Sequence, residues 1–325
     1  MSLLLDVKDL YVQYNTDDGV VYALNGVSLS LEKGETLGLV GETGAGKTTL
    51  ALSILGLLPE NVGQIKSGVI EYIGENLLTY SKDAIRRIRG EKISMIFQDP
   101  MTSLNPTMTV GRQVREVLDL HFKKLSEKEK QEKVNNLFRM VGIPPERQYE
   151  HPFQFSGGMK QRIVIAMALI GEPELILADE PTTALDVTIQ AQILELMRKL
   201  KAEFNTAMVL ITHDLGVVVE ICSKVGVIYS GQIVEMGSVE DIYSQNNNHP
   251  YTEGLFNCIP DLINESRRLT PIRGNMANLE ELPPGCKFCD RCNFRLDICG
   301  KEEPGYYTQG THSIKCHLYK DKWGE

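Results

Sequence analysis

The sequence of 325 residues contains no long hydrophobic run and few aromatic side chains. Only 7% of the residues are aromatic, with a single tryptophan, although 42% are hydrophobic, which is enough for a globular core. No apolar stretch approaches the roughly 18 residues that a membrane-spanning helix requires. Residues 1–7 are too short and too acidic for a signal peptide. We therefore expect a cytosolic protein that lacks a membrane span of its own.

Positive charge is also in deficit. Lys and Arg number 34 against 43 Asp and Glu, which gives a formal net charge of −9. Nucleic-acid-binding proteins need a basic surface, and here only a local patch could supply one. We therefore predict no nucleic-acid partner. The length suits one large domain with a smaller one, and no internal repeat or low-complexity tract interrupts it.

Seven cysteines are present, and they are distributed unevenly. Cys222 and Cys258 stand alone, whereas five thiols crowd the C-terminal tail: Cys286, Cys289, Cys292, Cys299 and Cys316. In a cytosolic chain such a cluster favours metal binding over disulfides. Four thiols complete a tetrahedral site, and spacing alone leaves two options open. These are zinc, with His312 or His317 as a possible fourth ligand, and an iron–sulfur cluster.

Hydrophobic periodicity predicts an α/β protein. The predicted strands cover residues 4–14, 20–31, 36–40, 67–73, 92–97, 175–178, 208–211, 225–229 and 232–236. The predicted helices cover two segments within 110–141, separated by a solvated run at 123–133, and then residues 156–170 and 189–204. Beyond about residue 248 the sequence changes to loops, prolines and cysteines. We therefore predict two domains, residues 1–248 and 249–325.

One glycine-rich stretch lies between the predicted strand 36–40 and a helix that begins near residue 50. It matches the phosphate-loop pattern G-x-x-x-x-G-K-S/T and supplies the candidate nucleotide-binding residues Gly41, Glu42, Thr43, Gly44, Ala45, Gly46, Lys47, Thr48 and Thr49. Glycines let backbone N–H groups surround an anion, and the helix N-terminus adds partial positive charge. We expect Lys47 to contact the β- and γ-phosphates and the Thr48 hydroxyl to bind Mg²⁺.

Polar residues follow three further predicted strands. Gln98 follows the strand 92–97, Asp179 and Glu180 follow 175–178, and His213 follows 208–211. Each alone is typical of an ordinary turn. Because ligands bind beyond the carboxyl ends of parallel strands, we expect these residues to lie in one crevice with the phosphate loop. Asp179 is then placed to bind Mg²⁺ and Glu180 to polarise an attacking water.

A second anion-binding helix N-terminus is predicted at Phe155-Ser156-Gly157-Gly158-Met159. It combines a serine hydroxyl with two glycine N–H groups at the start of the helix 156–170. One nucleotide rarely needs two such sites from one chain. We therefore predict a dimer in which the Ser-Gly-Gly of each subunit closes over the phosphate loop of the other.

In this order, the motifs resemble those of the ATP-binding-cassette (ABC) ATPases over residues 1 to about 245. They correspond to Walker A (41–48), the Q-loop (Gln98), the signature (155–159), Walker B (175–179) with Glu180, the D-loop (Ala184 to Asp186) and the switch histidine (His213). Phe155 and Met159 depart from the commonest signature.

The resemblance implies a fold and a set of roles. The fold is that of a P-loop NTPase: a RecA-like parallel-sheet core with an antiparallel β subdomain and a helical subdomain at about 100–165. The ligands are ATP and Mg²⁺, with Gln98 also contacting the metal. Glu180 acts as the base, with His213 and Gln98 sensing the γ-phosphate. Tyr14 corresponds to the aromatic that stacks on adenine, with Tyr22 or plain strand packing as alternatives.

Residues 98–106, 155–162 and 249–252 are similar to those of the ATPases of dipeptide and oligopeptide importers, and the whole chain resembles their "D" subunit. The resemblance implies a second, different ATPase chain, two permease subunits, an extracytoplasmic peptide-binding protein and a peripheral location at the cytoplasmic face of the membrane. Nickel importers share these features, so nickel is the alternative cargo.

Two other functional classes are less compatible with the sequence. Cassette ATPases of DNA repair or translation usually carry coiled-coil insertions or two cassettes, and this sequence has neither. An ATP-using iron–sulfur electron-transfer protein is the third class, and it would need a redox partner.

The same resemblance narrows the metal site. Some peptide-importer ATPases carry Cys-x₅-Cys-x₆-Cys and a distal cysteine that bind a 4Fe-4S cluster. This pattern corresponds to Cys286, Cys292, Cys299 and Cys316 and leaves Cys289 as an extra thiol. The small Cys-rich C-terminal domain is therefore expected to bind such a cluster, with zinc as the alternative.

Overall fold

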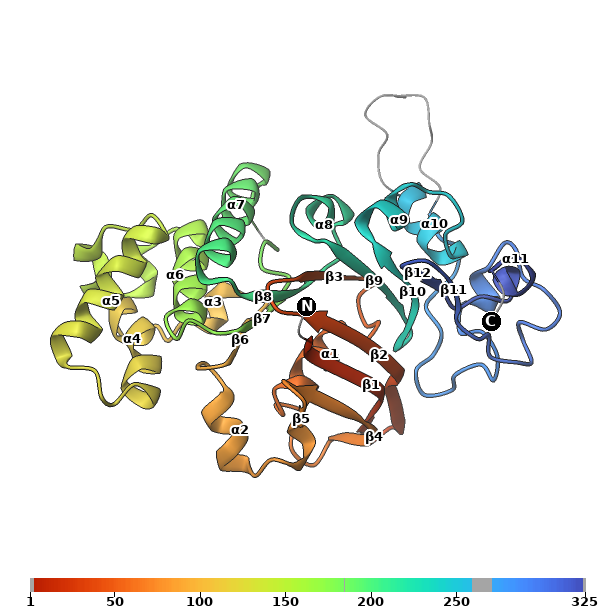
Figure 1. Ribbon diagram of the computed structural model, residues 1–325, viewed down its shortest axis with the longest axis horizontal. Coiled ribbons are helices and arrows are strands. Elements are labelled where there is room, and N and C mark those ends of the chain that lie inside the picture. The colour runs from red at the N-terminus through yellow and green to blue at the C-terminus, as the bar shows by residue number, and fades with distance from the viewer. Residues whose placement is uncertain (1–2, 184, 259–270, 324–325) are drawn as a thin grey trace. The chain divides into compact units, whose positions relative to one another are not determined.

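The computed structural model describes residues 3–183, 185–258 and 271–323 (Figure 1). The described chain is α/β, as predicted, and forms two compact units. Each unit is built from separated stretches of sequence. Unit 1 contains the stretch up to Leu5, Ser30–Leu37 and Glu71–Ile221, and unit 2 contains Asp6–Leu29, Gly38–Ile70 and the stretch from Cys222 onward.

Unit 1 contains three parallel strands in the order β8-β7-β6. They are β6 (Ile93–Ile96), β7 (Leu175–Asp179) and β8 (Ala207–Thr212). Every residue of β7 and β8 is buried, which explains their continuous apolar sequences. The parallel register aligns the carboxyl ends of the strands, with Ala178 of β7 opposite Leu210 of β8.

Helices make up most of the rest of unit 1. They are α2 (Lys82–Ile88), α3 (Pro100–Ser103), α4 (Val110–His121), α5 (Glu127–Met140), α6 (Gly157–Leu169), α7 (Val187–Phe204) and α8 (Leu215–Ile221). Helices α4, α5 and α6 pack on one another as the predicted helical subdomain (Figure 1). Their contact surface is apolar, because Val114, Leu118 and Phe138 are fully buried.

The start of α5 differs from the expectation. The charged run 123–133 was predicted to lie between two helices, but α5 already begins at Glu127. The reason is a capping box: the Ser126 hydroxyl accepts the N–H of Glu129, and the Glu129 carboxylate accepts the N–H of Ser126. Local capping therefore outweighed the low hydrophobicity on which the prediction relied.

Unit 2 contains antiparallel sheet. The strands β1 (Leu3–Asn15), β2 (Val20–Glu32) and β4 (Gly63–Tyr72) lie largely within it in the order β2-β1-β4, and the short β5 (Glu75–Asn76) of unit 1 pairs with the end of β4. The predicted hairpin is confirmed: β9 (Lys224–Tyr229) and β10 (Gln232–Ser238) flank Ser230 and Gly231, both with positive φ. The strand β3 (Thr36–Val40) ends in unit 2 and leads through the glycine-rich loop into α1 (Lys47–Ile54).

The C-terminal stretch adds secondary structure that the sequence did not predict. It contains α9 (Val239–Tyr243), α10 (Pro250–Asn257), α11 (Lys320–Trp323), β11 (Tyr307–Gln309) and β12 (His312–Ile314). The stretch also holds the short 3₁₀ helices η4 (Cys289–Arg291) and η5 (His317–Tyr319), whereas η1 (Leu77–Thr79), η2 (Pro145–Tyr149) and η3 (Pro152–Gln154) lie earlier in the chain. The two added strands extend the hairpin in the order β11-β12-β10-β9.

A buried polar network fastens β12 to β10. The Glu235 carboxylate is fully buried, lies 2.7 Å from His312 Nε2 and accepts a hydrogen bond from Asn248 Nδ2 at 3.0 Å. Its second oxygen accepts the backbone N–H of His249 at 3.0 Å. Buried carboxylates need such partners, so the tail and the hairpin share one core. The division at residue 248 stays a prediction. Within the described ranges, no helix is both long and apolar enough to cross a membrane.

Candidate functional site

Three of the predicted site residues meet in unit 1 at the carboxyl ends of its parallel strands. The Glu180 Oε1 atom lies 3.2 Å from His213 Nδ1, and Glu180 Oε2 accepts a hydrogen bond from Gln98 Nε2 at 3.0 Å. The Glu180 side chain is 11% exposed and that of His213 is 60% exposed. This places a nearly buried carboxylate between two polar side chains that reach solvent, an arrangement suited to holding a water molecule.

Glu180 also has an unusual backbone. Its φ is +45°, a left-handed conformation that strains a residue with a long side chain by about 1–3 kcal/mol. Such strain persists only where neighbours hold it. The Glu180 N–H donates to the Ile211 carbonyl at 2.9 Å, and the Thr183 hydroxyl donates to Glu180 Oε2 at 2.8 Å. Thr183 was not predicted, although a hydroxyl three residues beyond a carboxylate in a turn is a signal that could have indicated it.

Asp179, the predicted Mg²⁺ ligand, is the last residue of β7 and is 3% exposed. The turn that follows it is tied to α6, because Gln161 Nε2 donates to the Pro181 carbonyl at 2.6 Å. The helix that begins at the signature is thereby linked to the turn that carries Glu180.

The signature residues begin α6 as predicted. The Ser156 hydroxyl caps the helix by accepting the N–H of Met159 at 3.4 Å. The two glycines differ: a Cβ on Gly158 would lie 2.6 Å from Ile189 Cγ2, whereas a Cβ on Gly157 would meet only Leu185, at 4.0 Å. Packing among the described residues therefore requires glycine at 158, whereas at 157 it does not.

The D-loop continues into α7. Asp186 is the N-cap of that helix, with its Oδ1 atom accepting the N–H of Ile189 at 3.0 Å. Ala184, also assigned to this loop from the sequence, lies outside the described residues.

In unit 2, backbone carbonyls of the predicted phosphate loop accept hydrogen bonds from the lysine of the same loop. Lys47 is 6% exposed, and its Nζ atom donates to the carbonyls of Gly41 at 2.7 Å and Glu42 at 2.9 Å. Gly46, with φ of +104°, is the N-cap of α1. A Cβ on Gly46 would lie 2.6 Å from the Ala23 carbonyl oxygen. The loop is therefore closely packed, and its shape depends on glycine.

The remaining loop residues are accessible or lie next to α1. Thr43, Gly44 and Thr48 are exposed, and the Ala45 carbonyl accepts the N–H of Gly231 at 2.9 Å. Tyr14 lies beside the same helix, with its hydroxyl donating to Thr49 Oγ1 at 3.1 Å. The alternative aromatic Tyr22 is 42% exposed on β2, and its N–H donates to the Leu279 carbonyl at 2.8 Å.

The surroundings of the thiols assigned to a metal raise the pKa values of Cys316 and Cys286. Burial raises the pKa of Cys316 to about 12; the Leu318 N–H lowers it, and the nearby Cys286, Cys292 and Cys299 raise it further. Burial likewise raises the pKa of Cys286 to about 11. Among the described residues, no three His, Cys, Asp or Glu side chains form a ready-made metal site.

Backbone N–H groups point at several of these sulfurs. The N–H of Phe294 donates to Cys292 Sγ and that of Leu296 to Cys299 Sγ, each at 3.4 Å. Cys289 instead hydrogen-bonds the neighbouring Asp290 carboxylate at 3.5 Å. The extra thiol therefore has a different environment from Cys292 and Cys299.

Two family models match the chain. The model described as "ABC transporter" matches residues 24–183, and "Oligopeptide/dipeptide transporter, C-terminal region" matches residues 234–299.

The chain is also similar to curated and solved proteins. It is 48% identical to the dipeptide transport ATP-binding protein DppD of Bacillus subtilis, over 98% of this chain and 95% of that one. It is 49% identical to the oligopeptide transport ATP-binding protein OppD of Escherichia coli, over 93% and 89% of the two chains. A dimeric ATP-binding cassette, MJ0796, in a post-hydrolysis state with ADP and Pi, superposes with a TM-score of 0.65 at 27% identity, over 72% of this chain and 98% of that one.

Proposed function

We propose that this chain, which belongs to the family of ATP-binding subunits of dipeptide and oligopeptide ABC transporters, hydrolyses ATP to drive peptide import. The chain is 48% identical to DppD and 49% identical to OppD over nearly its full length, which supports this proposal. The match of its C-terminal stretch to a transporter-specific family model supports it as well. The relatives support transport rather than DNA repair, translation or electron transfer. Import of nickel by the same machine is the alternative.

The observation that carries the enzymatic role is the environment of Glu180. Its two carboxylate oxygens contact His213 on one side and Gln98 with Thr183 on the other. In the proposed reaction Glu180 orients a water molecule and accepts its proton as the oxygen attacks the γ-phosphorus, and the bond to ADP breaks. His213 contacts the γ-phosphate. Positioning and electrostatics supply most of the rate in such phosphoryl transfers.

The other predicted residues take binding roles in this proposal. The residues proposed to bind ATP are Tyr14, which stacks on adenine, and Gly41, Glu42, Thr43, Gly44, Ala45, Gly46, Lys47, Thr48 and Thr49 around the phosphates. Thr48, Gln98 and Asp179 fit Mg²⁺, because hydroxyl, amide and carboxylate oxygens are the ligands that this ion prefers. The ion neutralises phosphate charge when bound.

A second ATPase chain completes each site in the proposal. Ser156, Gly157, Gly158 and Met159 would contact the nucleotide of the partner, with Asp186 beside them. The space at Gly157 supports this, since no contact among the described residues requires glycine there. The solved relative MJ0796 is a dimer, which is consistent with the same arrangement. By resemblance to the family, the partner is a similar but different chain.

We also propose docking to two permease subunits at the cytoplasmic face of the membrane, with an extracytoplasmic protein delivering the peptide. Unit 1 exposes several large apolar side chains in and near the segments 97–101 and 149–153: Phe97 (45%), Met101 (59%), Tyr149 (70%) and Phe153 (75%). Exposed apolar side chains of this size are typical of protein contact surfaces. Phe97 and Met101 are close to Gln98 in the sequence, which would connect permease movement to the nucleotide.

For the C-terminal thiols we propose a 4Fe-4S cluster on Cys286, Cys292, Cys299 and Cys316, with zinc as the alternative. The donor chemistry suits a cluster, because thiolates are the usual ligands and N–H groups directed at sulfur tune such sites. Binding would have to draw the thiols together, since no three of the described side chains form a ready-made site. A cluster would supply a cross-link among loops that have little core of their own.

Reconstitution tests the function. The chain, its partner ATPase and the permeases are placed in vesicles with the peptide-binding protein, and uptake of labelled dipeptide, oligopeptide and nickel is measured with and without ATP. We expect ATP-dependent peptide uptake that Glu180→Gln abolishes. Nickel uptake without peptide uptake would support the alternative, and ATP turnover without any uptake would contradict import.

A further inference from the structure

The C-terminal cysteine loop, residues 286–299, contacts the phosphate loop through one ion pair. Arg291 Nη1 lies 2.7 Å from Glu42 Oε2, and Arg291 Nη2 lies 3.0 Å from Glu42 Oε1. The two residues are 249 positions apart in the sequence. The Arg291 side chain is 7% exposed and that of Glu42 is 30% exposed. This bidentate geometry is the strongest form of a guanidinium–carboxylate pair.

Aromatic rings hold the Arg291 guanidinium in place. It lies 5.7 Å from the ring centre of Tyr229 and 6.0 Å from that of Phe288, which belongs to the same cysteine loop. Arg291 Nε also donates to the Arg273 carbonyl at 3.0 Å. Burial alone would lower the pKa of Arg291, but its hydrogen bonds to Glu42 and Tyr229 keep it raised. The cation is therefore fixed in position and always charged.

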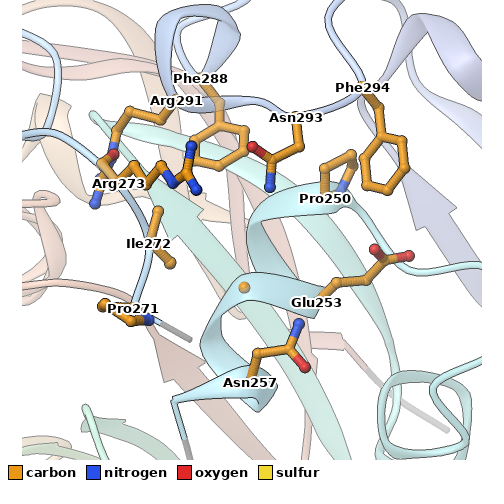
Figure 2. Close-up of a pocket in the computed structure, with 11 residues that line it drawn as sticks. Pro250, Glu253, Asn257, Pro271, Ile272, Arg273, Phe288, Arg291, Asn293 and Phe294 are labelled. Carbon is orange, nitrogen blue, oxygen red and sulfur yellow. The ribbon is translucent and has the colours of Figure 1, made fainter. Parts of the chain in front are cut away.

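Arg291 also lines a cavity of about 200 Å³. Figure 2 shows Arg291 and Phe288 on one wall, and Pro250, Glu253 and Asn257 of α10 on another. Arg291 therefore borders open space as well as the Glu42 carboxylate.

Glu42 itself is held at three points. Its carboxylate binds Arg291, its N–H donates to the buried Tyr251 hydroxyl at 2.9 Å, and its carbonyl accepts from Lys47 Nζ at 2.9 Å. The same residue thus connects the lysine of the phosphate loop with two residues from the C-terminal stretch. Met276 lies against the loop as well, 3.2 Å from the position of a Cβ on Gly44.

We propose that Arg291 is a positioning residue for the phosphate loop, and that nucleotide affinity is linked through it to the state of the cysteine loop. The proposal rests on the proposed function, because the loop must bind nucleotide. Without Arg291 the Glu42 side chain loses the partner that fixes it beside the loop, and its uncompensated carboxylate repels the incoming phosphates. Both effects weaken nucleotide binding more than catalysis.

The linkage follows from how the loop is closed. The Cys286 N–H donates to the Cys299 carbonyl at 2.8 Å, and Arg291 lies between these two positions in the sequence. Any ligand that ties the thiols together therefore restrains Arg291. Because coupling between two sites is reciprocal in binding free energy, nucleotide bound at the phosphate loop must strengthen the binding of such a ligand by the same factor.

The experiment measures the dissociation constant of a fluorescent ATP analogue by titration of the full chain. We expect Arg291→Met to raise it about 5- to 150-fold, the range of a typical coupling. Arg291→Lys should keep part of the affinity that Arg291→Met loses, since its single ammonium group can replace only part of the bidentate guanidinium contact. In ATPase assays the KM should rise while kcat changes little, which a merely structural role would not produce.

Arg295→Met is the matched control. Arg295 lies in the same loop and pairs with Asp290 at 2.7 Å, but no described contact joins it to the phosphate loop. Its removal should leave nucleotide affinity unchanged. Adding Arg291→Met to Glu42→Gln should also change the nucleotide affinity little, because the glutamine amide carries no charge for Arg291 to neutralise.

Alkylating the thiols of the full chain tests the linkage. It should weaken analogue binding in the wild-type chain but not further in Arg291→Met, and ATP should slow the alkylation. Equal affinity in the wild-type, Arg291→Met and Arg291→Lys chains would overturn the proposal, as would equal loss in Arg295→Met. If Arg291→Met does not fold, as judged by circular dichroism, Arg291→Lys and the alkylated wild-type chain decide the result. If even the wild-type chain fails to bind the analogue in a Lys47-dependent way, the proposed function itself is wrong.

Discussion

His213 Nδ1 lies 3.2 Å from Glu180 Oε1, so the histidine after β8 contacts the carboxylate after β7. This contact and the hydrogen bond from Gln98 hold both oxygens of the carboxylate, as the proposed role of Glu180 as the base requires. We expect Glu180→Gln to lower kcat by about 10²- to 10⁴-fold, the usual contribution of a general base. ATP binding should persist, because the amide keeps the size of the carboxylate. The turnover rate measures the loss of kcat, and the mass of the ATP-bound protein shows whether ATP binding persists.

The conservative variant Glu180→Asp is the control for this experiment. It keeps the charge but withdraws the carboxylate from His213, and we expect an intermediate rate. Undiminished turnover in Glu180→Gln would remove Glu180 from the role of base.

Thr183 gives a second, smaller prediction. Its hydroxyl donates to Glu180 Oε2 at 2.8 Å, and Thr183→Val removes that donor without changing the side-chain shape. A hydrogen bond of this kind contributes about 0.5–1.5 kcal/mol, so kcat should fall about 2- to 10-fold. Thr183→Ser, which keeps the hydroxyl, should retain the wild-type rate. Equal rates in the Val and Ser variants would show that the hydroxyl does not orient Glu180.

The two signature glycines should separate stability from catalysis. Gly158→Ala places a methyl group 2.6 Å from Ile189 Cγ2 and should lower the free energy of unfolding by about 1–3 kcal/mol, the cost of overpacking. In Gly157→Ala the added methyl group meets no described atom closer than 4.0 Å, so stability should be unchanged or slightly higher. If residue 157 serves the partner's nucleotide, the ATPase rate should nevertheless fall in this stable variant. Thermal unfolding and turnover distinguish the two outcomes.

Serine substitutions test the cluster proposal. Replacing any one of Cys286, Cys292, Cys299 or Cys316 should abolish the broad visible absorbance of anaerobically purified protein, whereas Cys289→Ser should keep it. The reason is that a cluster needs four thiolates and Cys289 lies beside Asp290 instead. Stoichiometric zinc with no visible absorbance in the wild-type chain would favour the alternative metal.

A buried histidine predicts a dependence of stability on pH. His249 is 1% exposed, and its Nδ1 atom accepts the N–H of Tyr251 at 3.0 Å. Burial lowers its pKa from 6.5 to about 3. Between these values the unfolded chain binds a proton that the folded chain excludes, so the free energy of unfolding falls as the pH decreases below 6.5 and is unaffected above it.

The size of the effect follows from the shift. The slope is about 1.4 kcal/mol per pH unit, so the loss between about pH 7 and pH 5 should be near 2 kcal/mol. His249→Asn keeps an oxygen that caps α10 and has no titrating group, so its urea midpoint should depend less on pH. Parallel curves for the two proteins would contradict the assignment.

The sequence was most informative where one local pattern dominates. The buried strands around Ile176 and Val209 and the hairpin turn at Ser230 follow from short apolar runs and turn residues, and the fold class is confirmed. The contacts among Gln98, Glu180 and His213 agree with the rule that parallel strands end at one edge. Their catalytic roles stay predictions.

Other features depend on contacts between residues far apart in the chain. The strand β12 is three residues long and is stabilised by Glu235, 77 residues before His312. Nothing near residue 312 indicates that partner. The Arg291–Glu42 pair was missed for the same reason, since sequence patterns report neighbours within a few residues. Thr183 was missed although it lies close to Glu180, because a threonine in a turn is common.

The interleaving of the two units has a consequence for synthesis on the ribosome. Unit 1 is complete once Ile221 has emerged, but unit 2 also needs the stretch from Cys222 onward. At about 5–20 residues per second, the phosphate loop waits on the order of ten seconds or more before Tyr251 and Arg291 are translated. The loop is thus translated well before the residues on which its packing depends.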